Sequence, residues 1–200
     1  MIRIGIYGGT FSPPHNGHLR AAKAFMEQMW LDILYVIPTA QPPHKELDGV
    51  ISARDRLNMC RLAFEGMEGV CVSDMEIARG GTSYTVETLR ELSGEDRRLF
   101  FLLGTDMLLT LDRWREPEEI FKLCYPVYVR RENDPALDKP IIEKIAEYHA
   151  KFGKVVRKIQ TEPILLSSSE IRERMERGES VSGLLPETVE RYIRDNHLYG

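Results

Sequence analysis

The chain has 200 residues, of which 42% are hydrophobic and 29% charged, as in an ordinary globular protein. Its net charge of −4 argues against a nucleic-acid partner, which would need a basic surface. The longest strongly apolar run, residues 99–103, is far too short to cross a bilayer, and the first residues lack the pattern of a secretory signal. We therefore expect a cytoplasmic protein that makes no contact with membranes.

The three cysteines, Cys60, Cys71 and Cys124, are odd in number, and none belongs to a CxxC pair. This pattern indicates reduced thiols rather than a disulfide framework. We expect each cysteine to be a small residue of the core rather than a metal ligand or a redox group.

Short apolar runs alternate with amphipathic segments along the chain. The apolar runs predict strands at residues 2–7, 33–37, 70–73, 99–103, 127–130 and 155–159. The amphipathic segments predict helices that begin near residues 17, 53, 85, 106, 117, 140, 168 and 186. This alternation predicts an α/β fold: a single Rossmann-like doubly wound domain with a mostly parallel sheet and helices on both faces. The domain would span residues 1–200, with a C-terminal helical part over about 163–200.

Four polar segments follow predicted strands or the last strand region. They are GGTFSPPHNGH at 8–18, PTAQPPHK at 38–45, GTD at 104–106 and SSSEIR at 167–172. Ligands of open parallel sheets bind in the crevice at the carboxyl ends of the strands. We therefore expect these segments to form one site on one edge of the sheet.

The first of these segments has the composition of an anion site. Gly8 and Gly9 allow a sharp turn and close approach of a ligand to the main chain. Asn16 is the expected N-cap of the following helix, whose first amides favour an anion. His18 then falls in the first helical turn and His15 one turn before it, so both rings can face the same point.

Several explanations fit two histidines at this spacing. A zinc site needs three or four ligands, and no further ligand pattern accompanies the pair. A serine or threonine nucleophile, Ser12 or Thr10, would lack the GxSxG elbow. Two packing or capping histidines are the plain structural explanation. A phosphate cradle accounts for the glycines, the helix start and both imidazoles together, and we favour it.

The segment GTFSPPHNGHL resembles the HxGH signature of the nucleotidyltransferase superfamily, and the chain is most similar to the bacterial nicotinate-mononucleotide adenylyltransferases. The segment SSSEIR resembles the second signature of that family, with Ser169 in the place of a threonine. Ser12 stands where many relatives carry Asp, which weakens any role for a loop carboxylate in holding a metal. The resemblance implies ATP contacts from these residues: Gly8, Gly9, Thr10, Phe11, His18, Gly104, Asp106, Ser168, Ser169 and Arg172.

The remaining motifs acquire roles only through this resemblance. It implies that Lys45 of PPHK lies at the nucleotide phosphates, although a solvated lysine would explain that residue alone. It implies that Tyr84 and Thr85 read the pyridine carboxylate and that Trp114 stacks on the ring, where a helix cap and a core Trp are the plain explanations. Thr10 and Lys45 complete the implied mononucleotide site. Asp106 and the Ser167–Glu170 pair would otherwise be simple helix caps.

The implied reaction is attack by the phosphate of nicotinate mononucleotide on the α-phosphorus of ATP, in NAD biosynthesis. His15, His18, Lys45 and Arg172 are the implied catalytic residues, and phosphates would favour protonated, doubly donating imidazoles. Mg²⁺ is the expected cofactor, held mainly through the ATP phosphates, with no metal site of the protein's own. Open alternatives are another acceptor, such as nicotinamide mononucleotide, phosphopantetheine or a substrate of CTP-dependent chemistry, and a non-catalytic nucleotide-binding regulator. A homo-oligomer is compatible with the sequence.

Overall fold

The fold is built on one sheet of six parallel strands. The structure is a computed structural model, and it describes residues 1–42, 51–130, 133–161 and 165–199. The spatial order of the strands is β3-β2-β1-β4-β5-β6, so two strands from the two halves of the chain, β1 and β4, lie at the centre. The strands are β1 Ile2–Gly9, β2 Ile33–Pro38, β3 Val70–Val72, β4 Arg97–Gly104, β5 Cys124–Val129 and β6 Arg157–Ile159.

Helices connect the strands and extend the chain beyond β6. The helices of the described residues are α1 Asn16–Gln28, α2 Ala53–Ala63, α3 Met75–Arg79, α4 Thr85–Leu92, α5 Thr105–Thr110, α6 Pro117–Leu123, α7 Asp138–Phe152, α8 Ser168–Glu176 and α9 Glu187–Asp195. Short 3-10 turns lie at η1 Leu111–Arg113 and η2 Pro135–Leu137. The sequence did not predict α3, because a helix of five residues is too short to show a helical period.

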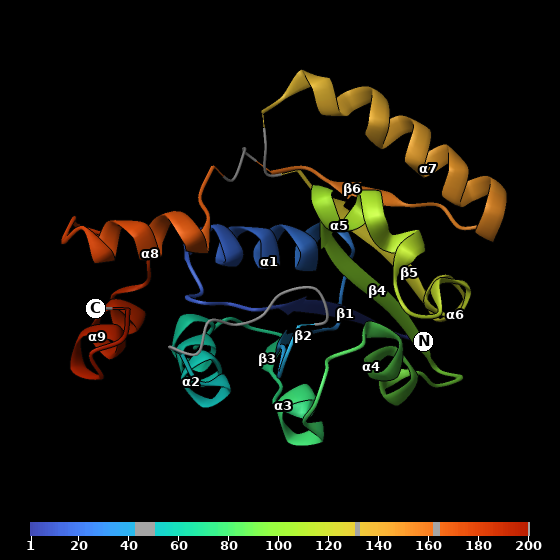
Figure 1. Cartoon of the computed structure of the whole chain (residues 1–200). Helices are drawn as coiled ribbons and strands as arrows, with labels where there is room; N and C mark the ends of the chain where they lie inside the picture. Colours follow the sequence, from blue (N-terminus) through green and yellow to red (C-terminus); the bar gives the residue numbers. More distant parts are fainter. Residues whose placement is uncertain (43–50, 131–132, 162–164, 200) are drawn as a thin grey trace.

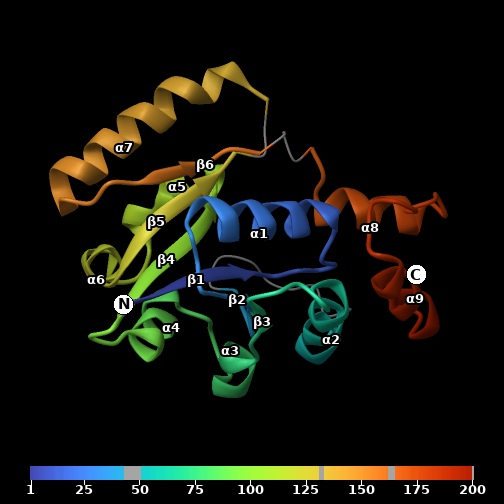
Figure 2. The same cartoon turned by 180° about the vertical axis from the view of Figure 1, so that it is seen from behind.

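Two hydrophobic cores cover the two faces of the sheet. One joins α1, α2 and α9 to strand residues such as Leu34 and Phe100. The other joins α4, α6 and α7 to strand residues such as Phe101. Phe100 and Phe101 face opposite cores because successive side chains of a strand point to opposite faces. The doubly wound α/β fold is therefore confirmed, and Figures 1 and 2 show the sheet between its helices.

Strand boundaries differ from the predictions at the far edge of the sheet. β5 begins at Cys124, three residues before the predicted start, because Pro126 lies within the strand and masked its pattern. β6 is only three residues long, Arg157–Ile159, and Val155 is 58% exposed rather than part of the strand. As an edge strand, β6 pairs with β5 alone, over three residue pairs.

The cysteine prediction is confirmed for two of the three residues. Cys60 and Cys124 are free thiols buried in the two cores, whereas Cys71 is exposed on the edge strand β3. In the part of the chain that the structure describes, no helix is both long enough and apolar enough to span a bilayer.

Candidate active site

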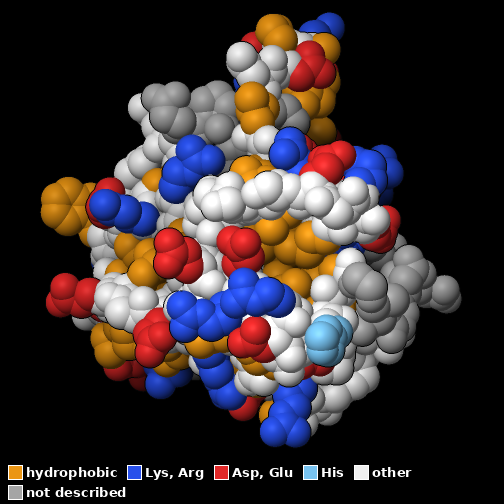
Figure 3. Space-filling view, turned by 90° about the vertical axis from the view of Figure 1, so that its left-hand side faces the viewer, with side chains coloured by type: hydrophobic (Ala, Val, Ile, Leu, Met, Phe, Trp, Pro, Cys, Tyr) orange, Lys and Arg blue, Asp and Glu red, His pale blue; other side chains and the backbone are white. Residues whose placement is uncertain are grey.

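A cavity of about 1310 Å³ opens at the carboxyl ends of the central strands. The strand ends Gly8 and Gly9 of β1 line it, together with residues of α4, α5, η1 and α8. Figure 3 views the edge where α8 and α9 lie and shows a hollow with hydrophobic side chains at its floor and charged side chains around it. This volume exceeds the ~300–1,000 Å³ of typical small-molecule pockets, so the cavity has room for two nucleotides.

The cavity brings together residues that lie up to about 160 positions apart in the sequence. The predicted site residues that line it are Gly8, Gly9, Thr10, Phe11, His18, Tyr84, Thr85, Asp106, Trp114, Ser168, Ser169 and Arg172. Gly104 is buried beneath the first turn of α5 and is not in the lining, and neither is His15. Lys45 lies outside the described residues. The expectation that the polar segments meet on one edge is therefore confirmed: each of the four contributes lining residues, and the described part of PTAQPPHK contributes Thr39 and Pro42.

Close packing fixes the loop between β1 and α1. Phe11 is 3% exposed and has a φ of 49°, a left-handed conformation that costs a non-glycine residue about 1 kcal/mol. Its ring packs edge-on against Tyr7 at 5.3 Å and lies 6.4 Å from the ring of Phe64. A Cβ on Gly9 would stand 3.1 Å from the Phe11 ring, so glycine at this strand end makes room for the turn.

The N-cap of α1 is His15, which corrects the prediction of Asn16. The backbone amide of His15 donates to Nδ1 of His18 at 3.1 Å, a bond that closes the first turn. Asn16 is instead held by the C-terminal part of the chain, since its Nδ2 donates to the carbonyl of Gly183 at 2.8 Å. This long-range contact could not be read from local sequence.

The two imidazoles stack on each other, with ring centroids 3.6 Å apart. His18 lines the cavity, whereas His15 is 2% exposed and lies outside the lining, so the two rings do not both face one point as expected. Because Nδ1 of His18 accepts this hydrogen bond, the ring nitrogen left to donate is Nε2. His18 can therefore offer Nε2–H to the cavity, and the protonated, doubly donating form that we expect beside phosphates stays a prediction.

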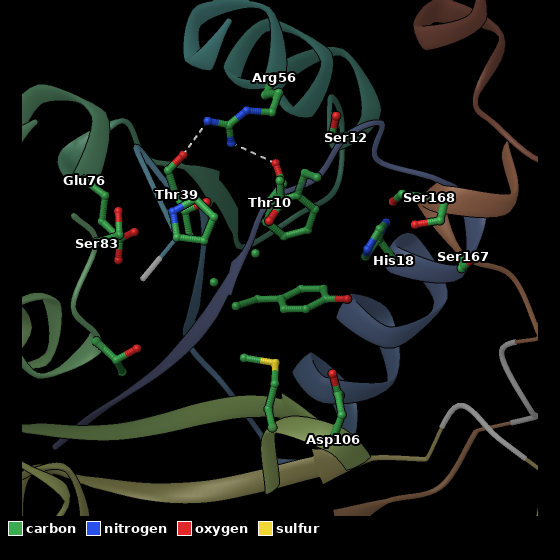
Figure 4. Close-up of a pocket in the computed structure, with 18 of the residues that line it drawn as sticks. Thr10, Ser12, His18, Thr39, Arg56, Glu76, Ser83, Asp106, Ser167 and Ser168 are labelled. Atoms are coloured by element: carbon green, nitrogen blue, oxygen red, sulfur yellow. Dashed lines mark hydrogen bonds between the residues drawn. The ribbon is translucent and has the colours of Figure 1, made fainter. Parts of the chain in front are cut away.

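The N-terminus of α8 is tied to the loop between β1 and α1. Ser167 caps the helix by accepting from the amide of Glu170 at 3.1 Å, as its spacing predicted. The Ser168 hydroxyl donates to the carbonyl of Pro13 at 2.9 Å. Arg172 donates to the carbonyl of Ser12 at 2.7 Å and to the Ser169 hydroxyl at 3.1 Å. The hydrogen bonds of the second signature thus position the first, and Figure 4 shows Ser168 and His18 among the residues that line the cavity.

Arg56 is a site residue that sequence reasoning missed. Its side chain is 1% exposed, and it donates to the carbonyls of Thr10 at 2.9 Å and Thr39 at 2.6 Å (Figure 4). It also donates to the carbonyl of Ala40 at 3.1 Å. It therefore joins the loop after β1 to the loop after β2. Burial lowers its pKa from the ordinary value, although an arginine remains charged at neutral pH. The sequence feature that could have indicated its burial is its place on α2: Arg56 lies on the same helix face as the buried residues Cys60 and Ala63.

A second group of residues forms the opposite wall of the cavity. Tyr84 is the N-cap of α4, and the Arg115 guanidinium lies 4.4 Å from the centre of its ring. Trp114 packs edge-on against Phe101 at 6.1 Å. Three polar residues that we did not predict, Glu76, Ser83 and Thr88, also line this wall.

Among the described residues, more positive than negative side chains line the cavity. Arg56, Arg113, Arg115 and Arg172 line it, against Glu76, Asp106 and Glu176. Within the described ranges, no group of three His, Cys, Asp or Glu residues is arranged to hold a metal. Mg²⁺ commonly binds through substrate phosphates with one or two carboxylates. Asp106, exposed at the start of α5 and facing the cavity, fits that use.

Comparison with known proteins agrees with this site. The model of the Cytidylyltransferase-like family matches residues 6–174. Two relatives named probable nicotinate-nucleotide adenylyltransferase are 40% identical, from Desulfatibacillum aliphaticivorans, and 41% identical, from Citrifermentans bemidjiense; each alignment covers 99% of this chain and at least 98% of the relative.

A solved structure shares the fold at lower identity. The nicotinic acid mononucleotide adenylyltransferase of Plasmodium falciparum, in complex with NaAD, superposes with a TM-score of 0.77 at 22% identity, covering 100% of this chain and 98% of that one. The sequence relatives match over their whole length, and the family model spans both signature segments up to α8. The chain therefore belongs to the Cytidylyltransferase-like family and, within it, to the nicotinate-nucleotide adenylyltransferases.

Proposed function

We propose that this chain transfers the adenylyl group of ATP to nicotinate mononucleotide, releasing pyrophosphate and forming nicotinate adenine dinucleotide for NAD biosynthesis. One observation carries the proposal: a single cavity joins the His18 and Arg172 wall to the Tyr84 and Trp114 wall. Full-length relatives at 40% and 41% identity that bear the name of this activity support it.

The two walls divide the substrates between them. We assign ATP to the loop after β1, to Gly104 and Asp106, and to the N-terminus of α8. We assign the mononucleotide to Thr10, Tyr84, Thr85 and Trp114, with Lys45 at the phosphates of both substrates. The cavity volume of about 1310 Å³ is adequate for both nucleotides at once.

The acceptor phosphate arrives ionised, so the reaction needs no general base. The protein has to align two polyanions and stabilise the negative charge that develops at the α-phosphorus and on the leaving pyrophosphate. In our assignment, Nε2–H of His18 donates to a phosphate oxygen, and Arg172 supplies fixed positive charge. His15 acts behind His18, since its amide holds Nδ1 and its ring stacks on the neighbouring imidazole.

A divalent cation, which we assign as Mg²⁺, would neutralise phosphate charge when bound with ATP. Asp106 is the residue we assign to a water or a ribose hydroxyl near it. Arg56 places a second fixed charge below the loop after β1, where Thr10 accepts from its guanidinium. We also propose that residues 1–200 act as one catalytic domain, including the C-terminal part from about residue 163, and that the protein works in the cytoplasm.

Nicotinamide mononucleotide is the second candidate acceptor. The observation that bears on this choice is the carboxyl group of Glu76 in the acceptor wall, whose protonation state decides which acceptor it favours. An ionised carboxylate at that position would accept from the amide of nicotinamide and repel the carboxylate of nicotinate.

The test is pyrophosphate release by the purified protein with ATP and Mg²⁺. Nicotinate mononucleotide, nicotinamide mononucleotide and phosphopantetheine are compared at equal concentration. We expect the nicotinate form to be the preferred acceptor, and chelation of the metal with EDTA to abolish the reaction. Absence of pyrophosphate release with all three acceptors would refute the proposal, and preference for phosphopantetheine would assign a different substrate.

A further inference from the structure

Glu76 is a buried acidic residue that the proposed mechanism does not use. It lies on α3, its side chain is 6% exposed, and it lines the cavity. Figure 4 shows Glu76 beside Ser83, across the cavity from His18 and Ser168. Glu76 therefore belongs to the wall that we assign to the acceptor, away from the wall that we assign to the ATP phosphates.

The two oxygens of the Glu76 carboxyl differ in their contacts. Oε1 accepts from the Thr88 hydroxyl at 2.7 Å, and that hydroxyl in turn accepts from Arg79 at 3.3 Å. The single hydroxyl proton of Thr88 is thus committed to Oε1. Oε2 is buried and has no hydrogen-bond partner among the described residues. A proton on the carboxyl therefore resides on Oε2, beside the Ser83 hydroxyl, which already accepts from the amide of Ala40 at 2.9 Å.

No lysine or arginine of the described ranges forms an ion pair with this carboxyl. Arg79, on the same helix, forms its ion pairs with Glu91 at 2.6 Å and Glu87 at 4.0 Å instead. Burial raises the pKa of Glu76 above its ordinary value, opposed by the Thr88 and Ser83 hydroxyls and by the charge of Arg79. A carboxylate on a bound ligand would add like charge and favour the neutral acid further.

We propose that Glu76 is a specificity-determining residue of the acceptor site: its neutral carboxyl donates from Oε2 to the ring carboxylate of the acceptor and so selects the acid over the amide. This inference rests on the proposed function and deepens it. The alternative is that Glu76 serves only to tie α3 to α4 through Thr88, in which case it has no effect on the choice of acceptor.

Two substitutions separate these roles. Glu76→Gln keeps the shape, an oxygen to accept from Thr88 and an amide donor in the place of Oε2. Glu76→Met keeps the length and removes both polar atoms. Glu91→Gln is the matched control, because it removes a carboxylate from the same Arg79 neighbourhood, outside the lining of the cavity.

The quantity to measure is the ratio of kcat/KM for nicotinate mononucleotide to kcat/KM for nicotinamide mononucleotide, at fixed ATP and Mg²⁺. Both values come from one preparation, so a partly unfolded variant gives the same ratio as a fully folded one. Losing a hydrogen bond to a charged group is expected to lower this ratio about tenfold or more in Glu76→Met. Glu76→Gln and the Glu91→Gln control are expected to keep the ratio within about threefold of the unaltered protein.

Three results would overturn the inference. An unchanged ratio in Glu76→Met would mean that Glu76 only connects α3 to α4 through Thr88. A higher ratio in Glu76→Gln would mean that an ionised carboxylate repels the acid, and an equal loss in both variants would remove the donor role. If the unaltered protein uses neither pyridine nucleotide, the proposed function fails and the inference falls with it. Activity with nicotinate mononucleotide and an unchanged ratio would refute the inference alone.

Discussion

Replacing Arg56 with methionine tests whether this buried guanidinium joins the two loops of the site. The substitution removes three hydrogen bonds, to the carbonyls of Thr10, Thr39 and Ala40. Each such bond to a charged group contributes about 1.5–3 kcal/mol, and each carbonyl left without its partner carries a further penalty. Against this, methionine no longer requires a charge to be buried, and Arg56 has no carboxylate partner to lose among the described residues.

The net loss in the free energy of unfolding is therefore expected to be about 3–5 kcal/mol, because the loss of three charge-assisted hydrogen bonds is partly offset by the removal of a buried charge. For a chain of 200 residues this corresponds to a fall in Tm of roughly 10 °C. Denaturant unfolding followed by circular dichroism measures the free energy directly.

A second measurement on the Arg56→Met variant is its change in Tm when nucleotide is added. Arg56 brings positive charge to a cavity that we assign to polyanions, so the rise in Tm on adding ATP is expected to be smaller in Arg56→Met than in Arg56→Lys, which keeps the charge. A loss of stability below about 1 kcal/mol, with an unchanged response to ATP, would refute the reasoning.

Three further substitutions test single side chains of the cavity. His18→Ala is expected to lower kcat/KM by about 3 kcal/mol, roughly 150-fold, as for a lost oxyanion donor; near-normal turnover would remove His18 from the mechanism. Arg172→Lys is expected to raise KM for ATP because lysine cannot reproduce the planar fork, and unchanged ATP affinity would contradict this. Glu76→Gln is expected to stabilise the fold at neutral pH. The raised pKa of Glu76 means that the native state binds its proton more tightly, so stability falls as pH rises above the ordinary value of 4.5 through the native pKa. Thermal unfolding across this range is expected to show that fall for the unaltered protein and a flatter profile for the Glu76→Gln variant; equal profiles would refute the linkage.

Local patterns were sufficient for the sheet and for most of the helices. A parallel strand buried on both faces reads as a continuous apolar run, which is why β1, β2 and β4 could be placed within about two residues. Local patterns did not predict elements that were short or atypical, such as α3 and the start of β5. In both cases, contacts with the rest of the fold stabilise a segment whose own pattern is weak.

The sequence by itself determined which residue types reach the edge of the sheet: the two signatures, the glycines and the caps carry their chemistry in local spacing. Only the tertiary structure decided how those residues act. In the fold, His15 caps α1 and its amide donates to His18. Ser168 of α8 donates to the loop after β1. Arg56 and Glu76 line the cavity although the sequence did not predict them, because burial and hydrogen-bond partners depend on segments far away in the chain. Spacing along the sequence records a side chain's type and its helix face, whereas its protonation and its partners are set by what folding packs around it.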